Sequence, residues 1–307
     1  MRNYGTFYEK VGNFLKKTLS LDNKLLMFFI NFLGFLSSLF FLIITFAHMS
    51  TVIYPSPIFG PIHSRRLGVS LGINLQPADG KVCTFDCIYC ECGFNADHHP
   101  TLPRPTREEV AKALEAKLKD MAENGPKPDV LTFAGNGEPT SHPHFAEIVD
   151  ATIALRNCYC PDAHISVLSN ATQLHRAEVR EALMKVDNNI QKLDTVDDAY
   201  IRLVNRPASR AYRVDDIIGQ LRLFGGHVII QTMFMHGSID GEDVGNTAER
   251  YVAPWLEAVR LIQPAEVMIY TIDRPTPDTC LQKATPLELD AIRRRVEDMG
   301  IACTASY

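Results

Sequence analysis

The chain has 307 residues, of which 46% are hydrophobic and 22% are charged. This composition excludes a disordered chain and a small disulfide-stapled domain, because the chain is long and apolar enough to bury a sizeable core. Lys and Arg total 31 against 36 Asp and Glu, which gives a formal net charge of -5. Dedicated nucleic-acid binders usually carry a basic surplus, so nucleic acid is not favoured as a partner.

The N-terminal region differs from the rest of the chain. No residue from Leu25 to Ala47 carries a charge, and an apolar helix of that length crosses the roughly 30 Å core of a bilayer. The sequence therefore predicts a transmembrane helix over residues 25–47, within an apolar N-terminal extension over residues 1–48. Basic residues precede the apolar run, and the positive-inside tendency would place the part that follows outside the cytoplasm.

Export conflicts with the reduced thiols that the cysteine motif below requires, because an oxidising compartment pairs or oxidises such thiols. We therefore favour a second interpretation, in which residues 1–48 are an upstream stretch wrongly joined to a soluble protein that begins at Met49. On this interpretation the protein is cytoplasmic. It is anchored to a membrane only if residues 25–47 are genuinely part of it.

From residue 49 to residue 307, short apolar runs alternate with longer helical patterns, without a repeat or a low-complexity linker. Strand and helix alternate about six times, which favours one α/β domain over 49–307 with parallel strands, a partial (β/α)6 barrel preceded by the N-terminal apolar helix. Functional side chains of such folds lie at the carboxyl ends of the strands. The predicted strands are 67–75, 130–133, 165–168, 190–193, 228–233 and 267–270, and the predicted helices are 106–124, 144–156, 176–186, 214–224, 247–262 and 286–299.

Four of the eight cysteines lie in the loop after the first predicted strand, at Cys83, Cys87, Cys90 and Cys92. This clustering indicates a metal centre in a reducing compartment rather than a disulfide framework. Iron–sulfur clusters prefer thiolate ligands, and three thiolates at Cys83, Cys87 and Cys90 would leave one iron of a four-iron cluster open to an exchangeable molecule. The alternative is a zinc site with Cys92 as the fourth ligand, although the sequence lacks the second ligand pair that zinc sites usually use.

Two motifs together carry a family resemblance. The spacing of Cys83, Cys87 and Cys90 resembles the signature of the radical S-adenosylmethionine (SAM) superfamily. The segment Ala134-Gly135-Asn136-Gly137-Glu138-Pro139-Thr140 is similar to that superfamily's glycine-glycine-glutamate motif, here with an asparagine between the glycines. Residues 59–68 further resemble a subgroup of iron–sulfur oxidoreductases akin to wyosine synthetases. These similarities span nearly everything after Ile58.

The resemblance implies a radical SAM domain over 49–307, with a 4Fe–4S cluster on Cys83, Cys87 and Cys90 and with SAM on the open iron. It implies reductive cleavage of SAM to a 5′-deoxyadenosyl radical, hydrogen abstraction from an unknown substrate, and an electron donor such as flavodoxin or ferredoxin. The protein itself would orient the cofactor and the substrate and would exclude competing reactions. The implied SAM contacts are Tyr89 beside the adenine, Gly135, Asn136, Gly137 and Glu138 around the amino group, and Ser169, Asn170, Lys192 and Asp194 at the next two strand ends. No catalytic side chain is assigned.

Each of these assignments has a structural alternative. Gly-Asn-Gly after a strand is also a common turn, Ser169 and Asn170 suit ordinary turn chemistry, and Lys192 with Asp194 suits a surface ion pair. The function has alternatives as well. These are a tRNA-modifying enzyme akin to wyosine synthetases, a glycyl-radical activase that acts on a protein loop, and a non-enzymatic zinc or iron–sulfur binding module.

Overall fold

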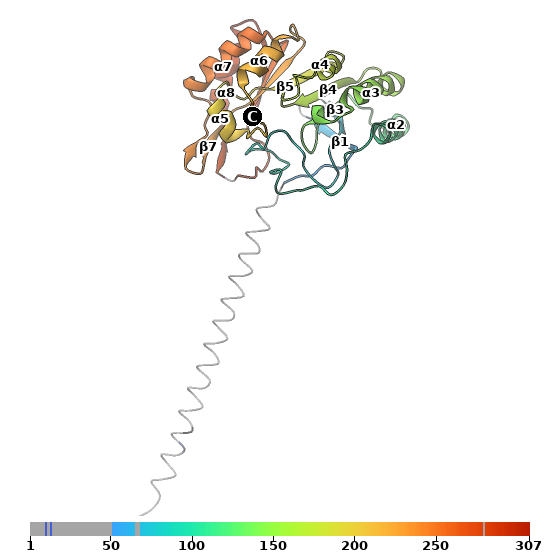
Figure 1. Ribbon diagram of the computed structural model, residues 1–307, viewed down its shortest axis with the longest axis horizontal. Helices are drawn as coiled ribbons and strands as arrows, with labels where there is room; N and C mark the ends of the chain where they lie inside the picture. Colours follow the sequence, from blue (N-terminus) through green and yellow to red (C-terminus); the bar gives the residue numbers. More distant parts are fainter. Residues whose placement is uncertain (1–9, 11–12, 14–50, 65–67, 279) are drawn as a thin grey trace, which may run out of the picture. The chain divides into compact units, whose positions relative to one another are not determined.

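The computed structural model describes residues 10, 13, 51–64, 68–278 and 280–307 (Figure 1). Its main sheet has eight strands in the order β1-β2-β3-β4-β5-β6-β9-β11. β1 pairs with β2 antiparallel, and the other neighbouring pairs are parallel. The strands are β1 (Ile58–Ser64), β2 (Gly68–Ile73), β3 (Val130–Phe133), β4 (His164–Ser169), β5 (Asn188–Lys192), β6 (Ile229–Met233), β9 (Glu266–Tyr270) and β11 (Ala302–Ser306).

Helices connect the successive parallel strands. Because the strands follow one another in chain order without a reversal, right-handed crossovers place the connecting helices on one face of the sheet. In Figure 1 the helices α7, α6, α4, α3 and α2 follow one another along the outer side of the strands. The helices are α2 (Arg107–Asn124), α3 (Phe145–Tyr159), α4 (Ala177–Leu183), α5 (Asp198–Val204), α6 (Val214–Arg222), α7 (Glu249–Ile262) and α8 (Pro286–Glu297), with a 3-10 turn η1 (Pro139–Ser141) after β3.

The predicted α/β fold with a mostly parallel sheet is confirmed, and the open sheet is consistent with a partial barrel. The six predicted strands correspond to β2, β3, β4, β5, β6 and β9. The structure adds a seventh parallel strand, β11, the antiparallel edge strand β1, and a small sheet in the order β10-β7-β8. The strands of the small sheet are β7 (Met235–Ile239), β8 (Glu242–Asp243) and β10 (Leu281–Lys283).

The hydrophobic core lies between the outer face of the sheet and the helices. On β2 and β3 the residues of one face, such as Leu71 and Phe133, are fully buried. They belong to the same core as the buried face of α2, which includes Leu114 and Leu118. As the sequence predicts, Thr106 caps α2, here in a capping box with Glu109. Core packing on this face fixes the positions of the strands and therefore of the loops that follow their carboxyl ends.

The opposite face of the sheet carries polar side chains on β2, β3, β4 and β5. The hydroxyls of Ser70 and Thr132 are 2.9 Å apart, and the amide of Asn188 donates to the Ser166 hydroxyl at 3.0 Å. Alternation along each strand assigns these residues to the face that points away from the helix layer. This inner face leads to the carboxyl edge of the sheet, where the predicted site residues lie.

The transmembrane prediction requires correction. Among the residues that the structure describes, none of the helices combines the length and the apolar character needed to cross a bilayer. The predicted span itself, residues 25–47, lies outside the described residues, as does the predicted apolar N-terminal helix. The described helices are amphipathic or short elements of the α/β unit instead.

Candidate active site at the carboxyl edge of the sheet

The cysteine loop follows β2 and carries three free thiols. Cys87 is buried, and Cys83 and Cys90 are partly exposed. The loop is fastened to the chain that follows α5, where the Asp86 N–H donates to the Asn205 carbonyl at 2.9 Å. This long-range backbone contact gives the three thiols a fixed backbone although the loop has no regular secondary structure.

The glycine strip after β3 lies directly beside the start of the cysteine loop. Val82 and Gly137 form a parallel bridge, in which the Val82 N–H donates to the Asn136 carbonyl at 2.9 Å. Gly137 has φ +135, and a Cβ placed on it would lie 2.0 Å from the Val82 carbonyl oxygen. Only glycine fits this approach, so the two predicted motifs are brought together by a contact that depends on the second glycine.

The remaining part of the strip is also tightly enclosed. Gly135 has φ +122, and a Cβ on it would lie 2.7 Å from the side chain of Asn74. The fully buried Asn136 side chain accepts from the Tyr54 N–H at 2.7 Å and donates to the carbonyls of Tyr54 and Pro77. The side-chain amide of Asn136 therefore holds the segment before β1. The predicted SAM contact of Asn136 is left to its backbone.

The Glu138 carboxylate is buried and joins two strand ends. It accepts from the Thr140 N–H at 3.0 Å at the start of η1 and from the Asn170 N–H at 2.7 Å after β4. Burial raises the pKa of Glu138, and these donors counteract that rise. Ser169, the other predicted residue here, accepts from the Ala171 N–H at 3.1 Å. Glu138 and Ser169 thus shape the loop ends that flank the cysteines.

Two asparagine amides point at cysteine sulfurs. Asn170 Nδ2 lies 3.6 Å from Cys83 Sγ and 2.8 Å from the Thr84 hydroxyl. Asn205 Nδ2 lies 3.5 Å from Cys87 Sγ. Burial raises the pKa of Cys83 above its usual range and that of Cys87 to about 11. Amide donors of this kind stabilise thiolates that burial would otherwise disfavour.

The third thiol has the opposite shift. A hydrogen bond from the Cys92 thiol lowers the pKa of Cys90 to about 6 and raises that of Cys92 itself. Cys92, buried beside the strip, also lies 3.4 Å from the Gly135 carbonyl oxygen. Cys92 is therefore a neighbour of the predicted ligand set, where it supports the Cys90 thiolate.

A buried ammonium, that of Lys81, interacts electrostatically with all three thiols. Lys81 Nζ donates to the Gly93 carbonyl at 2.5 Å and lies 3.3 Å from the Asp86 carboxylate. Burial alone lowers the pKa of Lys81, but the negative charges of the three thiolates and of Asp86 outweigh burial and raise it. Lys81 thus remains charged and offsets part of the negative charge that three thiolates create.

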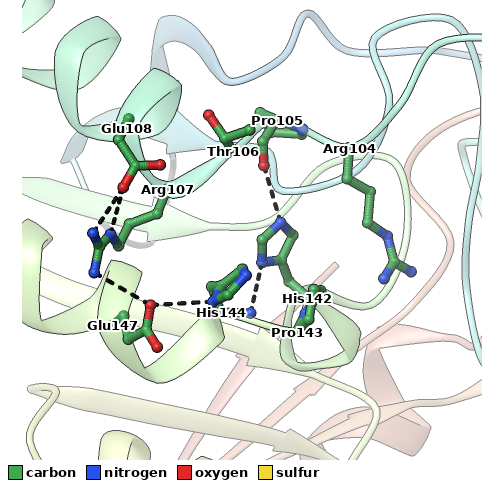
Figure 2. A pocket seen from close by; sticks show the side chains of 9 residues that line it. All are labelled: Arg104, Pro105, Thr106, Arg107, Glu108, His142, Pro143, His144 and Glu147. Carbon is green, nitrogen blue, oxygen red and sulfur yellow. Dashed lines mark hydrogen bonds and ion pairs between the residues drawn. The ribbon is translucent and has the colours of Figure 1, made fainter.

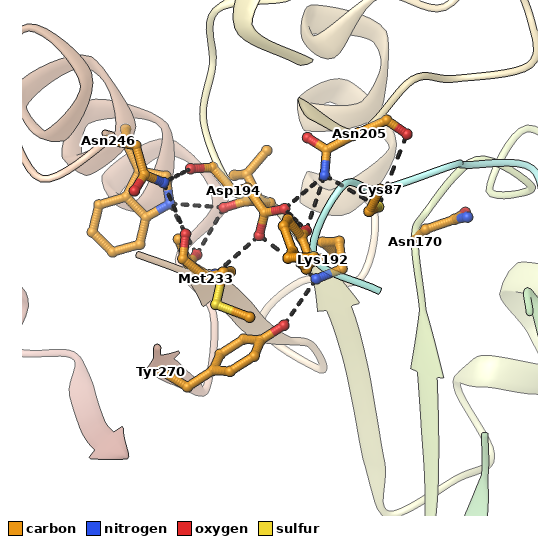
Figure 3. A network of polar contacts seen from close by, with 12 residues as sticks. Cys87, Asn170, Lys192, Asp194, Asn205, Met233, Asn246 and Tyr270 are labelled. Atoms are coloured by element: carbon orange, nitrogen blue, oxygen red, sulfur yellow. Dashed lines mark hydrogen bonds and ion pairs between the residues drawn. The ribbon is translucent and has the colours of Figure 1, made fainter. Parts of the chain in front are cut away.

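At the end of β5, Lys192 and Asp194 form a buried network rather than a surface ion pair (Figure 3). Lys192 Nζ lies 3.6 Å from Asp194 Oδ1, 3.0 Å from the Tyr270 hydroxyl and 5.1 Å from the centre of the Tyr89 ring. The Tyr89 hydroxyl donates to Asp194, and the Met233 N–H donates to the same carboxylate at 3.0 Å. Burial lowers the pKa of Lys192, but Asp194 and Tyr270 outweigh it, so the pKa is raised.

A surface hollow of about 430 Å³ lies elsewhere, at the starts of α2 and α3 (Figure 2). Most of its charged groups are paired with one another: Arg107 bonds to Glu108 and Glu147, and His144 bonds to Glu147. Arg104 bonds to Gln76 and Ser141 instead. None of the predicted site residues lines it. The lining residues are Arg104, Pro105, Thr106, Arg107, Glu108, His142, Pro143, His144 and Glu147.

Comparison with known families supports the predicted resemblance. The sequence model that describes the radical SAM superfamily matches residues 79–250, which is more than half of the chain and includes the cysteine loop, the glycine strip and the end of β5 with Lys192 and Asp194. The chain belongs to the radical SAM superfamily. The expected cofactors are confirmed as those of this superfamily, a 4Fe–4S cluster and SAM.

Several known proteins resemble this radical SAM chain. A UPF0026 protein of Helicobacter pylori is 30% identical over 227 residues, which cover 72% of this chain and 68% of that protein. SuiB from Streptococcus suis, solved bound to SAM, has a TM-score of 0.55 at 16% identity and covers 77% of this chain; this chain spans about half of SuiB, 50%. TYW1, solved with a lysine–pyruvate adduct, has a TM-score of 0.51 at 12% identity over 75% of this chain and 73% of that chain. At these identities the two solved structures show the fold alone.

The donor set of this radical SAM chain fits a cluster of several irons. Within the described part of the chain, no three His, Cys, Asp or Glu side chains converge tightly enough to hold one metal ion. A 4Fe–4S cluster does not require such convergence, because each thiolate binds a different iron atom. Three free thiols on one loop, two amide donors and a buried ammonium meet the needs of an anionic cluster.

The structure adds residues to this radical SAM site that the sequence did not reveal. Asn205, Lys81 and Tyr270 are not part of either motif, yet each contacts the predicted ligands or the β5 network. Tyr270 is the last residue of β9, so it could have been predicted from the rule that functional side chains lie at the carboxyl ends of strands. Asn205 follows a short helix and lies 118 positions from Cys87, so it left no local signal.

Proposed function

We propose that this chain is an enzyme that cleaves SAM reductively and uses the resulting radical to abstract hydrogen from a substrate. When bound, the 4Fe–4S cluster supplies the electron that breaks the carbon–sulfur bond of SAM, giving methionine and a 5′-deoxyadenosyl radical. A one-electron donor such as flavodoxin or ferredoxin would supply the electron to the cluster. The three thiols of Cys83, Cys87 and Cys90 are the proposed cluster ligands.

One observation carries this proposal. The loop with the three thiols is bonded along its first residues to the Gly135–Gly137 strip, through the bridge between Val82 and Gly137. A cluster on the thiols and a ligand on the strip would therefore be neighbours. A zinc-binding module does not require such a glycine strip, nor a buried ammonium and carboxylate at the next strand ends.

The roles of the protein groups follow from their chemistry. Backbone carbonyls of the strip suit the ammonium group of SAM, because carbonyl oxygens accept charge-assisted hydrogen bonds from an ammonium. Lys192 suits the SAM carboxylate, because its ammonium group is positively charged and is held in place by Asp194 and Tyr270. Asp194, fixed by the Met233 N–H, suits the ribose hydroxyls. Tyr89 remains the proposed neighbour of the adenine.

Anaerobic reconstitution tests the proposal. We expect a brown protein with about four irons per chain that forms 5′-deoxyadenosine and methionine from SAM once dithionite is added. Cys87→Ala is expected to abolish this activity with the fold retained by circular dichroism. Cys158→Ala is the matched control, because Cys158 is an exposed thiol outside the site, and it is expected to behave as wild type. A colourless protein with one zinc, or full activity in Cys87→Ala, would contradict the proposal.

A further inference from the structure

Asn205 lies at the contact between the cysteine loop and the β5 network. It is the C-terminal cap of α5 and is buried at 2% exposure. Its backbone is held on both sides, because its N–H donates to the Ile201 carbonyl at 2.8 Å and its carbonyl accepts from the Asp86 N–H at 2.9 Å. The position of its side chain is therefore set by the backbone of two separate elements.

The Asn205 amide nitrogen has three acceptors within reach. Nδ2 lies 2.8 Å from Asp194 Oδ2, 3.0 Å from the Tyr89 hydroxyl and 3.5 Å from Cys87 Sγ (Figure 3). The carboxylate accepts only, so it requires the nitrogen rather than the oxygen of the amide to face it. The Met233 N–H fixes that carboxylate from the other side. The orientation of the amide is thus determined, and one of its two hydrogens is taken by Asp194.

The second hydrogen is available to Cys87. In the thiol form, Cys87 Sγ also lies 3.9 Å from the Asn205 carbonyl and donates to it. That contact requires the thiol proton, which is lost when the sulfur binds iron. The contact with Nδ2 persists in the thiolate and becomes a charge-assisted hydrogen bond, which is stronger than the bond to the neutral Tyr89 hydroxyl.

We propose that Asn205 is a positioning residue that raises the reduction potential of the cluster through an N–H···S bond to the Cys87 ligand. Hydrogen bonds to ligand sulfurs are among the groups that set cluster potentials. Reduction adds negative charge to the cluster, so a donor to sulfur stabilises the reduced state more than the oxidised state. The inference rests on the proposed function only in that the three cysteines bind a cluster.

The test is a potentiometric titration of the reconstituted cluster in the absence of SAM, in which electron paramagnetic resonance (EPR) measures the fraction of reduced cluster at each potential. Asn205→Leu removes the donor with little change in side-chain size, and its midpoint potential is expected to shift to a more negative value. Asn246→Leu is the matched control, because Asn246 is a buried amide of the same network that bonds to the Met233 carbonyl and not to a cysteine sulfur. Its potential is expected to equal that of wild type.

A second measurement avoids the need for Asn205→Leu to fold. Protein labelled with ¹⁵N in asparagine side chains, and carrying Asn170→Leu to remove the other amide near a cysteine sulfur, is expected to show ¹⁵N hyperfine coupling to the reduced cluster. An unchanged potential in cluster-loaded Asn205→Leu, or no ¹⁵N coupling, would overturn the role of Asn205 alone. A wild-type protein that binds no cluster would overturn the proposed function as well.

Discussion

Replacing Gly137 by alanine tests the contact that joins the two motifs. The added Cβ would lie 2.0 Å from the Val82 carbonyl oxygen, which is backbone and cannot move aside without breaking the bridge. Breaking the bridge removes two backbone hydrogen bonds, Val82 N–H to Asn136 O and Glu138 N–H to Val82 O, at about 1 kcal/mol each. An alanine at φ +135 adds about 1–3 kcal/mol of backbone strain. Together these effects predict a loss of about 3–5 kcal/mol in the free energy of unfolding.

The assay is equilibrium urea unfolding of the cluster-free protein under reducing conditions. Gly219→Ala is the matched control: Gly219 lies within α6, and a Cβ there would meet no atom within 4 Å. Alanine favours a helix interior, so this variant is expected to gain about 0.5–1 kcal/mol. We also expect Gly137→Ala to take up less iron than Gly219→Ala on reconstitution. Equal urea midpoints for Gly137→Ala and wild type would refute the reasoning.

Two further predictions concern charged groups. Lys192→Met is expected to weaken SAM binding by the cluster-loaded protein about 10- to 100-fold in equilibrium dialysis, which corresponds to one charge-assisted hydrogen bond; an unchanged affinity would exclude Lys192 as the carboxylate partner. Burial alone would raise the pKa of Glu288, but hydrogen bonds from His236 and Thr285 outweigh burial and lower the pKa to about 2 from 4.5. Because the folded-state value is the lower one, the stabilisation is present above pH 4.5 and is lost as the pH falls toward 2. Glu288→Gln is therefore expected to lower the urea midpoint at pH 7 more than at pH 3, and an equal effect at both pH values would contradict this assignment.

The sheet could be predicted from the sequence where its strands are buried. Strands such as β3 and β4 are short β-branched runs covered by helices, which give a strong local pattern. β11 escaped prediction because Ala302–Ser306 is an edge strand with exposed alternate residues and no apolar run. The small sheet escaped for a similar reason, since β7 contains His236 and Gly237.

The candidate site was predictable only where motifs mark it. The cysteine spacing and the glycine strip are local patterns, and the family resemblance singled out Lys192 and Asp194 near a strand end, where the structure places their charged groups 3.6 Å apart. The contacts that each side chain makes could not be predicted, because they join residues that lie far apart in the sequence. Asn136, for example, holds Tyr54 at a separation of 82 positions. The same limit explains why Asn205, far from every motif, was not foreseen.

The most direct test of the central claim is whether SAM binds the cluster held by these three thiols. Reconstituted protein would be reduced, mixed with SAM labelled with ¹⁵N in its amino group, and examined by pulsed EPR. The account predicts a changed cluster signal with ¹⁵N coupling in the wild-type protein. A protein with a complete 4Fe–4S cluster whose signal is unaffected by SAM and shows no ¹⁵N coupling would contradict it.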